Sequence, residues 1–249
     1  MTNEQGDSRF LILSRYCKCK AILIEYCRIV KDRKVRVRLK FVKNLFSAVL
    51  AGIMISFGGA VYLACVAAEK AQLGAILFSL GLSVILIMGF LLFTGKTAYL
   101  LENKPAYIPY LLTIWLGNIL GCMLMGLMVG FAKPNLAETA KTLCEAKLGQ
   151  TPWQTLILGA LCGILVYIAV DYFKSDDDKK SLPKYLLVFT CVPAFILCGF
   201  EHSVADMFYF AAANTLYSVK GIVYILLVSA GNLVGAVAFH MLKKAVLKK

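Results

Sequence analysis

The chain has 249 residues, of which 60% are hydrophobic and only 16% are charged, and its mean hydropathy is +0.75. Water-soluble domains carry about 45–50% apolar and about 25% charged residues. This composition therefore excludes a water-soluble globule. It also excludes a disordered chain, a collagen-like fibre and a small disulfide scaffold. The composition predicts an integral membrane protein.

The net charge is +13, from 27 Lys and Arg against 14 Asp and Glu. In a soluble protein such an excess would indicate nucleic-acid binding. Here twelve of the basic residues lie in residues 1–44, outside the apolar stretches. Basic residues beside membrane spans set the orientation of the protein, because they stay on the cytoplasmic side. The charge therefore predicts membrane topology, and we expect no nucleic-acid partner.

Six apolar stretches are long enough to cross a bilayer as helices, which takes about 20 residues each. They are residues 45–68, 73–94, 107–132, 154–173, 184–213 and 221–242. The second stretch ends in a polar break at residues 92–96, and the fifth is interrupted at residues 199–203. With an even number of spans both termini lie on one side, which then holds 22 of the 27 Lys and Arg. The sequence thus predicts a multi-pass protein of the cell inner (plasma) membrane with both termini cytoplasmic.

The spans divide the chain into a basic N-terminal segment of residues 1–44, a six-helix domain of residues 45–242 and a basic tail of residues 243–249. Residues 35–43 alternate apolar and basic side chains, which suits either a helix or an extended segment on the anionic inner leaflet. The first residues are acidic where a secretory signal is basic, so the spans themselves are expected to direct insertion.

Nine cysteines are present, and none forms a CxxC pair, so neither a zinc site nor a thioredoxin-type motif is indicated. Three of them, Cys17, Cys19 and Cys27, lie in the basic N-terminal segment. The others lie in or beside apolar stretches, where cysteine behaves as a small hydrophobe and is expected to stay reduced. These are Cys65, Cys122, Cys144, Cys162, Cys191 and Cys198.

The two halves of the six-helix domain repeat each other at offsets of 110 to 114 residues. The matching pairs are Gly52 and Gly163, Gly89-Phe90 and Gly199-Phe200, and the GNxxG motifs at 117–121 and 231–235. Three spans per half is an odd number, so the second half must enter the membrane from the opposite side. This predicts an all-α fold with a 3+3 inverted repeat, whose pathway runs between the two breaks at the repeat interface.

Ionisable residues are nearly absent from the middle of the spans, except for Glu201, His202 and Asp206 at the fifth break. Charges at this depth are costly, which makes them functional-site candidates. His202 is one of two histidines; the other, His240, is expected at the membrane interface. The alternative for His202 is a ring satisfied by helix packing. No second His or Cys stands at ligand spacing, so no metal is expected.

These motifs resemble the formate/nitrite transporter family. The resemblance rests on Gly-Phe-Glu-His-Ser at 199–203, Leu-Phe-Thr-Gly at 92–95 and the paired GNxxG helices, and it covers about residues 45–242. It implies an aquaporin-like fold, a homopentamer with one pore per protomer, and small monovalent weak-acid anions as substrates: formate, nitrite or hydrosulfide. Residues 45–242 would then be the channel domain, without a cofactor.

The resemblance also assigns residues to the pore. It implies a central His202 with Glu201 beside it, a facing Thr94, and a vestibule Lys147 that attracts anions from a short exterior loop. Apolar constrictions and supporting amides complete the set: Phe78, Leu82, Leu92, Phe195, Asn118 and Asn232. Two positions depart from the family pattern, since Val166-Tyr167 stands where members usually carry Cys-Asn, and Asp206 where many carry Asn. The loss of the asparagine favours a hydrosulfide-type or other subgroup.

The pore hypothesis is coherent on physical grounds as well. Two apolar rings enclosing a polar chamber would oppose a bare anion, which pays a large desolvation penalty, but would pass a neutral weak acid. A proton relayed from water or His202 would then accompany each anion. The main alternative is a proton-coupled secondary transporter working by alternating access. A water channel would need Asn-Pro-Ala boxes, and an enzyme a motif such as GxSxG or HExxH; the sequence contains none of these.

Overall fold

The computed structural model describes residues 37–175, 181–216 and 218–247. The chain divides into two compact units, Met1–Lys43 and Asn44–Lys249. The predictions for Cys17, Cys19, Cys27 and most of the basic N-terminal segment lie outside the described residues. All regular structure in the described ranges is helical, and five helices there are long and apolar enough to cross a membrane. A sixth, shorter apolar helix covers Leu182–Leu197, as the prediction of an all-α fold requires.

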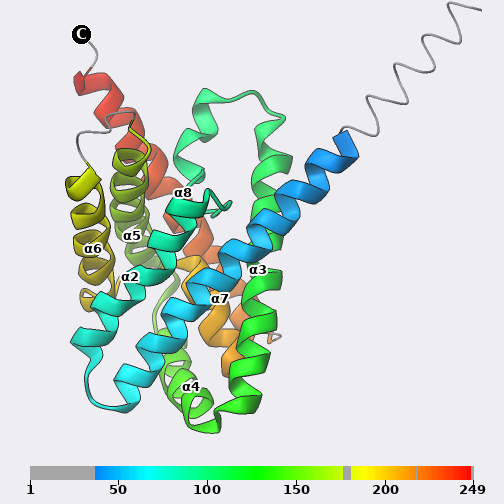
Figure 1. The fold of residues 1–249 in the computed structure, drawn as a ribbon, viewed down its shortest axis with the longest axis vertical. Helices are drawn as coiled ribbons and strands as arrows, with labels where there is room; N and C mark the ends of the chain where they lie inside the picture. Colours follow the sequence, from blue (N-terminus) through cyan, green and yellow to red (C-terminus); the bar gives the residue numbers. More distant parts are fainter. Residues whose placement is uncertain (1–36, 176–180, 217, 248–249) are drawn as a thin grey trace, which may run out of the picture. The chain divides into compact units, whose positions relative to one another are not determined.

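The first half of the repeat holds three spans and one break, and Figure 1 shows how they are arranged. A helix covers Val37–Ala67, followed by α2 (Ala71–Met88), a non-helical break, the short 3₁₀ helix η1 (Thr97–Glu102) and α3 (Tyr107–Ala132). The first helix already includes Val37, ahead of the boundary expected at residue 45. Of the two conformations open for residues 35–43, the described part is therefore helical.

Between the halves lies a helix that the sequence analysis missed. Residues 133–153, between the third and fourth expected spans, are expected as an exterior loop, but Pro134–Leu148 form helix α4. Its proline at the first turn has a φ already suited to a helix, and Gly149 follows its end. The segment is too polar and too short to span a membrane, so a search for apolar stretches passes over it. The correction matters because Lys147 lies in the last turn of this helix.

The second half repeats the plan of the first. It comprises α5 (Pro152–Phe173), α6 (Ser181–Leu197), a break, α7 (Ser203–Ala212) and α8 (Val219–Leu247). Thr151 and Gln154 form a capping box at the start of α5. The predicted fifth span is thus two helices, α6 and α7, on either side of the break. Helix α8 continues to Leu247, past the boundary expected at residue 242.

The two breaks are built alike and are held by equivalent asparagines. Asn118 on α3 accepts from the Phe93 amide at 2.8 Å and donates to the Leu91 carbonyl at 3.0 Å. Asn232 on α8 accepts from the Ser203 amide at 2.9 Å and donates to the Glu201 carbonyl at 2.8 Å. Both breaks begin at a glycine with positive φ, 70° at residue 89 and 67° at residue 199, where glycine has no steric penalty. The repeat therefore extends to individual hydrogen bonds.

Close helix crossings position these asparagines. A Cβ added at Gly52 would lie 2.3 Å from the Asn118 carbonyl oxygen, and one at Gly163 would lie 2.2 Å from that of Asn232. Larger side chains at either glycine would push the asparagine-bearing helix away. Helix α5 lies beside both α6 and α8, so this crossing is part of an extensive contact (Figure 1).

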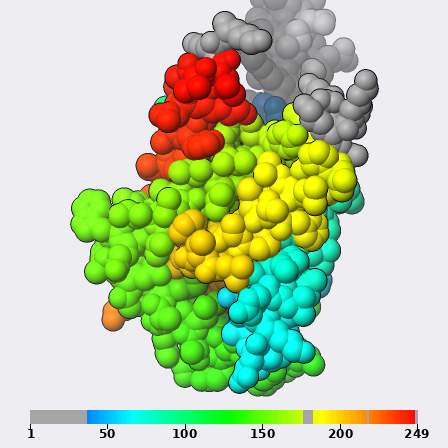
Figure 2. All heavy atoms as spheres, turned by 90° about the vertical axis from the view of Figure 1, so that its left-hand side faces the viewer, coloured from blue at the N-terminus to red at the C-terminus, as the bar shows by residue number. Residues whose placement is uncertain are grey.

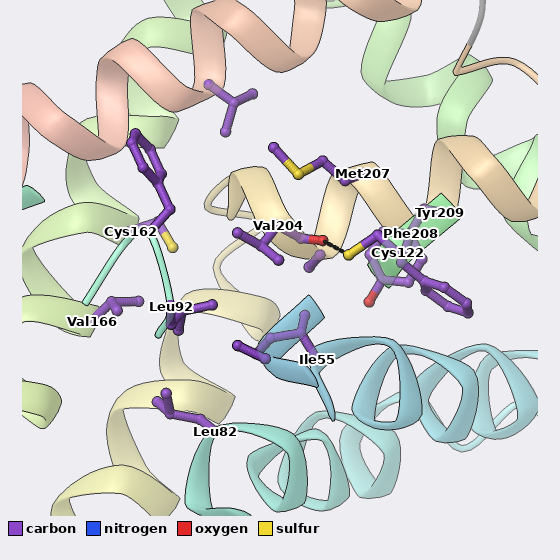
Figure 3. Packing of buried hydrophobic residues seen from close by; sticks show 14 of the residues in the cluster. Ile55, Leu82, Leu92, Cys122, Cys162, Val166, Val204, Met207, Phe208 and Tyr209 are labelled. Atoms are coloured by element: carbon purple, nitrogen blue, oxygen red, sulfur yellow. Dashed lines mark hydrogen bonds between the residues drawn. The ribbon is translucent and has the colours of Figure 1, made fainter. Parts of the chain in front are cut away.

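The outer surface of the second unit is apolar over wide areas. On α3, side chains at a spacing of four residues are about half exposed: Leu112, Leu116, Leu120 and Leu124. Figure 2 shows the face on which α6 (yellow) adjoins α2 (cyan), and these helices also expose apolar side chains. Such a surface suits lipid or other protomers rather than water. The core beneath is equally apolar, and Figure 3 shows Leu82 and Leu92 in it near Ile55.

Candidate transport pathway

His202 lies at the fifth break and is the N-cap residue of α7. The residue is 4% exposed. The Ala205 backbone amide donates to Nδ1 at 3.1 Å, and Nε2 lies 2.9 Å from Thr94 Oγ1. Thr94 belongs to the first break, so this pair joins the two halves of the repeat. The sequence prediction that Thr94 faces His202 agrees with this geometry.

The backbone contact restricts the protonation state of the ring. Nδ1 uses its lone pair to accept from Ala205, so in the neutral ring the proton sits on Nε2, which donates to Thr94. A second proton, on Nδ1, would occupy the lone pair that accepts from the Ala205 amide. The N-cap hydrogen bond of α7 would then be lost. His202 therefore suits the role of a neutral hydrogen-bonding group better than that of a proton carrier.

A first cavity, here called the acidic cavity, lies on one side of His202. It has a volume of about 230 Å³ and is lined by His202, Phe78 and Phe195, among others. Phe195 stacks on the His202 ring with centroids 5.6 Å apart, and Phe78 contacts Phe195 edge-on at 6.3 Å. The two phenylalanines come from α6 and α2. They form an apolar wall next to the histidine, as the constriction hypothesis requires.

Charged groups gather in the same cavity. The Lys147 ammonium forms ion pairs with Glu201 and with Asp206, the latter at 3.0 Å. The Gln150 amide donates to the other oxygen of Glu201 at 2.7 Å. Burial alone would lower the pKa of Lys147, but the carboxylates of Asp206 and Glu201 outweigh burial and raise it. Lys147 is therefore a charged, paired lysine on a helix, not a free lysine in a loop.

A second cavity, here called the basic cavity, lies beyond the first break. It has a volume of about 210 Å³ and is lined by Leu82, Leu92, Gly95, Lys96 and Lys174, among others. Lys174 donates to the Gly95 carbonyl at 3.3 Å. Burial and the neighbouring Lys96 ammonium lower the pKa of Lys174 to about 8. Nothing in the local sequence of these two lysines sets them apart from the other basic residues of the chain, so the sequence does not predict them as part of a site.

The structure thus brings the predicted pore residues together in order. Phe78, Phe195 and His202 line one cavity, and Leu82 and Leu92 line the other. Thr94, which contacts His202, precedes Gly95 of the second cavity in the chain. Asn118 and Asn232 lie outside the cavities and hold the breaks. The partnership of Asp206 with Lys147 was missed, because it depends on α4.

His240, which the sequence places near the end of the last span, is only 9% exposed and packs against side chains of neighbouring segments. Its Nδ1 lies 2.9 Å from the Tyr167 hydroxyl, and its Nε2 lies 3.0 Å from a Glu102 carboxylate oxygen. Tyr167 is one of the two residues that depart from the family pattern in α5. The contact gives this departure a structural reason, because the tyrosine ties α5 to α8.

Two breaks facing each other across a histidine–threonine contact, with a cavity on either side, define a class of helical membrane protein with a central pathway. Comparisons with known proteins agree. The family model described as "Formate/nitrite transporter" matches residues 25–245. The chain therefore belongs to the formate/nitrite transporter family.

Curated relatives carry names from this family. The chain is 31% identical over 179 residues to the "Nitrite transporter NirC" of Salmonella typhimurium, covering 65% of each chain. It is 29% identical over 147 residues to the "Formate channel FocA" of Haemophilus influenzae, covering 54% of this chain and 51% of the relative. The matches thus span between half and two thirds of these relatives. The relatives are transporters and channels, which confirms that the chain is not an enzyme.

Solved structures share the fold. The chain is similar to a "Pentameric formate channel with formate bound", with a TM-score of 0.71, 24% identity, and coverage of 84% of this chain and 98% of that one. It is also similar to an "FNT family ion channel", with a TM-score of 0.74 and 24% identity, covering 84% and 91%. These likenesses confirm the predicted aquaporin-like membrane fold.

Proposed function

We propose that the protein conducts small monovalent anions of weak acids, such as formate, nitrite or hydrosulfide, through one pathway in each protomer. The observation that carries the proposal is the buried contact between Thr94 and His202, with a cavity and an apolar pair on either side. The names of the relatives support the substrate class. The pentameric structural neighbour supports assembly as a homopentamer.

The pathway runs from the acidic cavity past Phe78 and Phe195 to His202, and then past Leu82 and Leu92 to the basic cavity. Charge bias in the sequence favours cytoplasmic termini in the inner (plasma) membrane, which places the basic cavity on the cytoplasmic side. The apolar pairs oppose a bare anion, because desolvation of an ion costs several kcal/mol. A neutral weak acid crosses more easily, so an anion takes up a proton for the passage.

The central test is uptake by vesicles that contain the purified protein. Addition of formate, nitrite or hydrosulfide should make the outer medium more alkaline, because each anion that enters as neutral acid removes one proton from outside. A pH electrode in the outer medium measures the change, and vesicles without protein give the background. Uptake that follows membrane voltage without an external pH change would contradict passage as neutral acid. A low turnover limit that persists at high anion concentration would favour alternating access.

The constrictions are tested by their effect on chloride, the anion of a strong acid. Phe195→Ala and Leu82→Ala should each raise chloride flux about tenfold, which corresponds to a barrier lowered by ~1.4 kcal/mol. The reason is that a wider, wetter opening removes part of the desolvation penalty. Chloride efflux from vesicles measures this change in chloride flux. Leu80→Ala is the matched control, because Leu80 lies on α2 but is 52% exposed and does not line either cavity. If all three variants behave alike, the two residues do not line the path.

A further inference from the structure

The acidic cavity holds more carboxyl groups than ammonium groups. One ammonium, that of Lys147, contacts two carboxylates, those of Glu201 and Asp206. The side chains of these residues are 13%, 2% and 1% exposed. If both carboxylates were ionised, the cluster would carry a net charge of −1 in a place that water hardly reaches. A buried, uncompensated charge is strongly unfavourable, and such groups respond by taking up a proton.

The hydrogen bonds indicate where this proton belongs. Both oxygens of Glu201 have donors, one from Lys147 and one from Gln150. Asp206 Oδ1 faces the Lys147 ammonium at 3.0 Å. Asp206 Oδ2 is buried and has no hydrogen-bond partner among the described residues. An oxygen that lacks a donor is the place in this cluster where a proton is least opposed, and Asp206 lines the cavity.

We propose that Asp206 and Glu201 together hold one proton beside Lys147, and that Asp206 exchanges it with the anion that passes. This inference rests on the proposed function and names the proton donor for it. In uptake, the Asp206 O–H bond breaks and an O–H or S–H bond forms on the anion, which proceeds as neutral acid. The Asp206 carboxylate left behind takes a proton from water in the cavity, and the hydroxide that remains passes to the outer medium. One anion and one proton are thus consumed outside per molecule that crosses.

The carboxyl pair is the part of the cluster that changes its protonation state, because the titratable groups around it keep theirs. The other titratable side chains facing it from the Val37–Ala67 helix, α4, α5, the break, α7 and α8 are Tyr62, Cys144, Lys147, Cys162, His202, Tyr209 and Tyr224. Tyrosine and cysteine are ordinarily neutral at neutral pH. His202 accepts from the Ala205 amide, which keeps its ring neutral. Lys147 stays charged beside the carboxylates.

The identity of residue 206 therefore sets the charge of the cavity. With asparagine there, Lys147 and Glu201 would balance each other and no spare proton would be held. With aspartate, the cluster is neutral while it holds the proton and negative after losing it. Asp206 thus allows the acidic cavity to hold one proton. The attraction of the cavity for anions falls once that proton is lost.

The test is the variant Asp206→Asn in vesicles, measured as the ratio of its initial uptake rate to that of the original protein at each pH. Taking the ratio cancels the change in the bulk concentration of neutral acid. Between about pH 5 and about pH 9 the ratio should rise, from about one tenth to one or above. The ratio is low at low pH because the variant lacks the proton-donating Asp206 carboxyl. The ratio rises with pH because Asp206 of the original protein loses its proton and stops donating it. A ratio that is constant with pH would overturn the proposal.

Two controls separate this inference from the proposed function. Glu145→Gln removes one exposed carboxylate from the same helix as Lys147 and should give a ratio near one at every pH. Infrared spectra at neutral pH should show a protonated carboxyl band that Asp206→Asn removes; a spectrum without such a band would also overturn the proposal. If the original protein moves none of the three anions, the proposed function fails. If the original protein moves the anions but the rate ratio does not change with pH, the role of Asp206 as proton donor fails and the proposed function stands.

Discussion

Replacement of His202 by phenylalanine is expected to reduce weak-acid flux at least tenfold, which corresponds to a barrier raised by ~1.4 kcal/mol or more. His202 is the polar group next to Phe195 and Phe78, and it makes the contact with Thr94. A phenylalanine there would extend the apolar wall through the centre of the path. An anion would then lose the Nε2 donor on its way between the two cavities and could use the Thr94 hydroxyl alone of this pair.

His202→Asn is the matched variant. Asparagine is a favoured N-cap residue, so its side chain keeps an acceptor for the Ala205 amide. Its amide nitrogen still offers a donor on this side of the chain, although it does not reach as far toward Thr94 as Nε2 does, and it does not titrate. If the histidine acts as a neutral hydrogen-bonding group, His202→Asn should retain most of the flux that His202→Phe loses. Equal loss in both variants would indicate that the imidazole itself carries the proton. Unchanged flux in His202→Phe would show that the path does not pass this residue.

The sequence predicts the spans and the breaks well, for a physical reason. A helix in lipid must be apolar over its whole length, and a polar interruption such as residues 199–203 is tolerated only where protein or water meets it. The repeat of Gly89-Phe90 as Gly199-Phe200 adds a second, independent signal. This information is local, so a single sequence carries it.

Contacts that depend on the missed helix were not predictable in the same way. Lys147 was expected in a loop as a free charge that attracts anions. Its pairing with Glu201 and Asp206 follows from α4 folding back over the cavity. Pro134 and Gly149 mark the ends of α4, but the polar segment between them has no property that predicts where it packs. The attraction of anions by Lys147 stays a prediction, now with two carboxylates opposing it.

The other contacts that the sequence does not predict have a similar cause. Lys96 and Lys174 are 78 positions apart in the sequence and meet only because the first break and the end of α5 line one cavity. Tyr167 and His240 likewise meet through the crossing of α5 and α8. Glycine motifs indicate that such crossings exist, but they do not indicate which polar side chains each crossing brings together.

The second large effect is expected from the asparagines that hold the breaks. Asn232→Ala leaves the Ser203 amide and the Glu201 carbonyl without their partner, and Asn118→Ala does the same to the Phe93 amide and the Leu91 carbonyl. Each buried polar group left unpaired costs about 1–3 kcal/mol. Both variants should therefore unfold at a clearly lower temperature in detergent and lose most of their flux in vesicles.

Asn135→Ala provides the control, because Asn135 is an exposed asparagine in the first turn of α4, away from both breaks. It should match the original protein in unfolding temperature and in flux. Because the two asparagines make equivalent bonds, their variants should be destabilised to a similar degree. Unfolding at the control temperature by either variant would contradict the view that one side chain holds each break. A loss of flux without a loss of stability would instead place that asparagine in the path, among the groups that contact the anion.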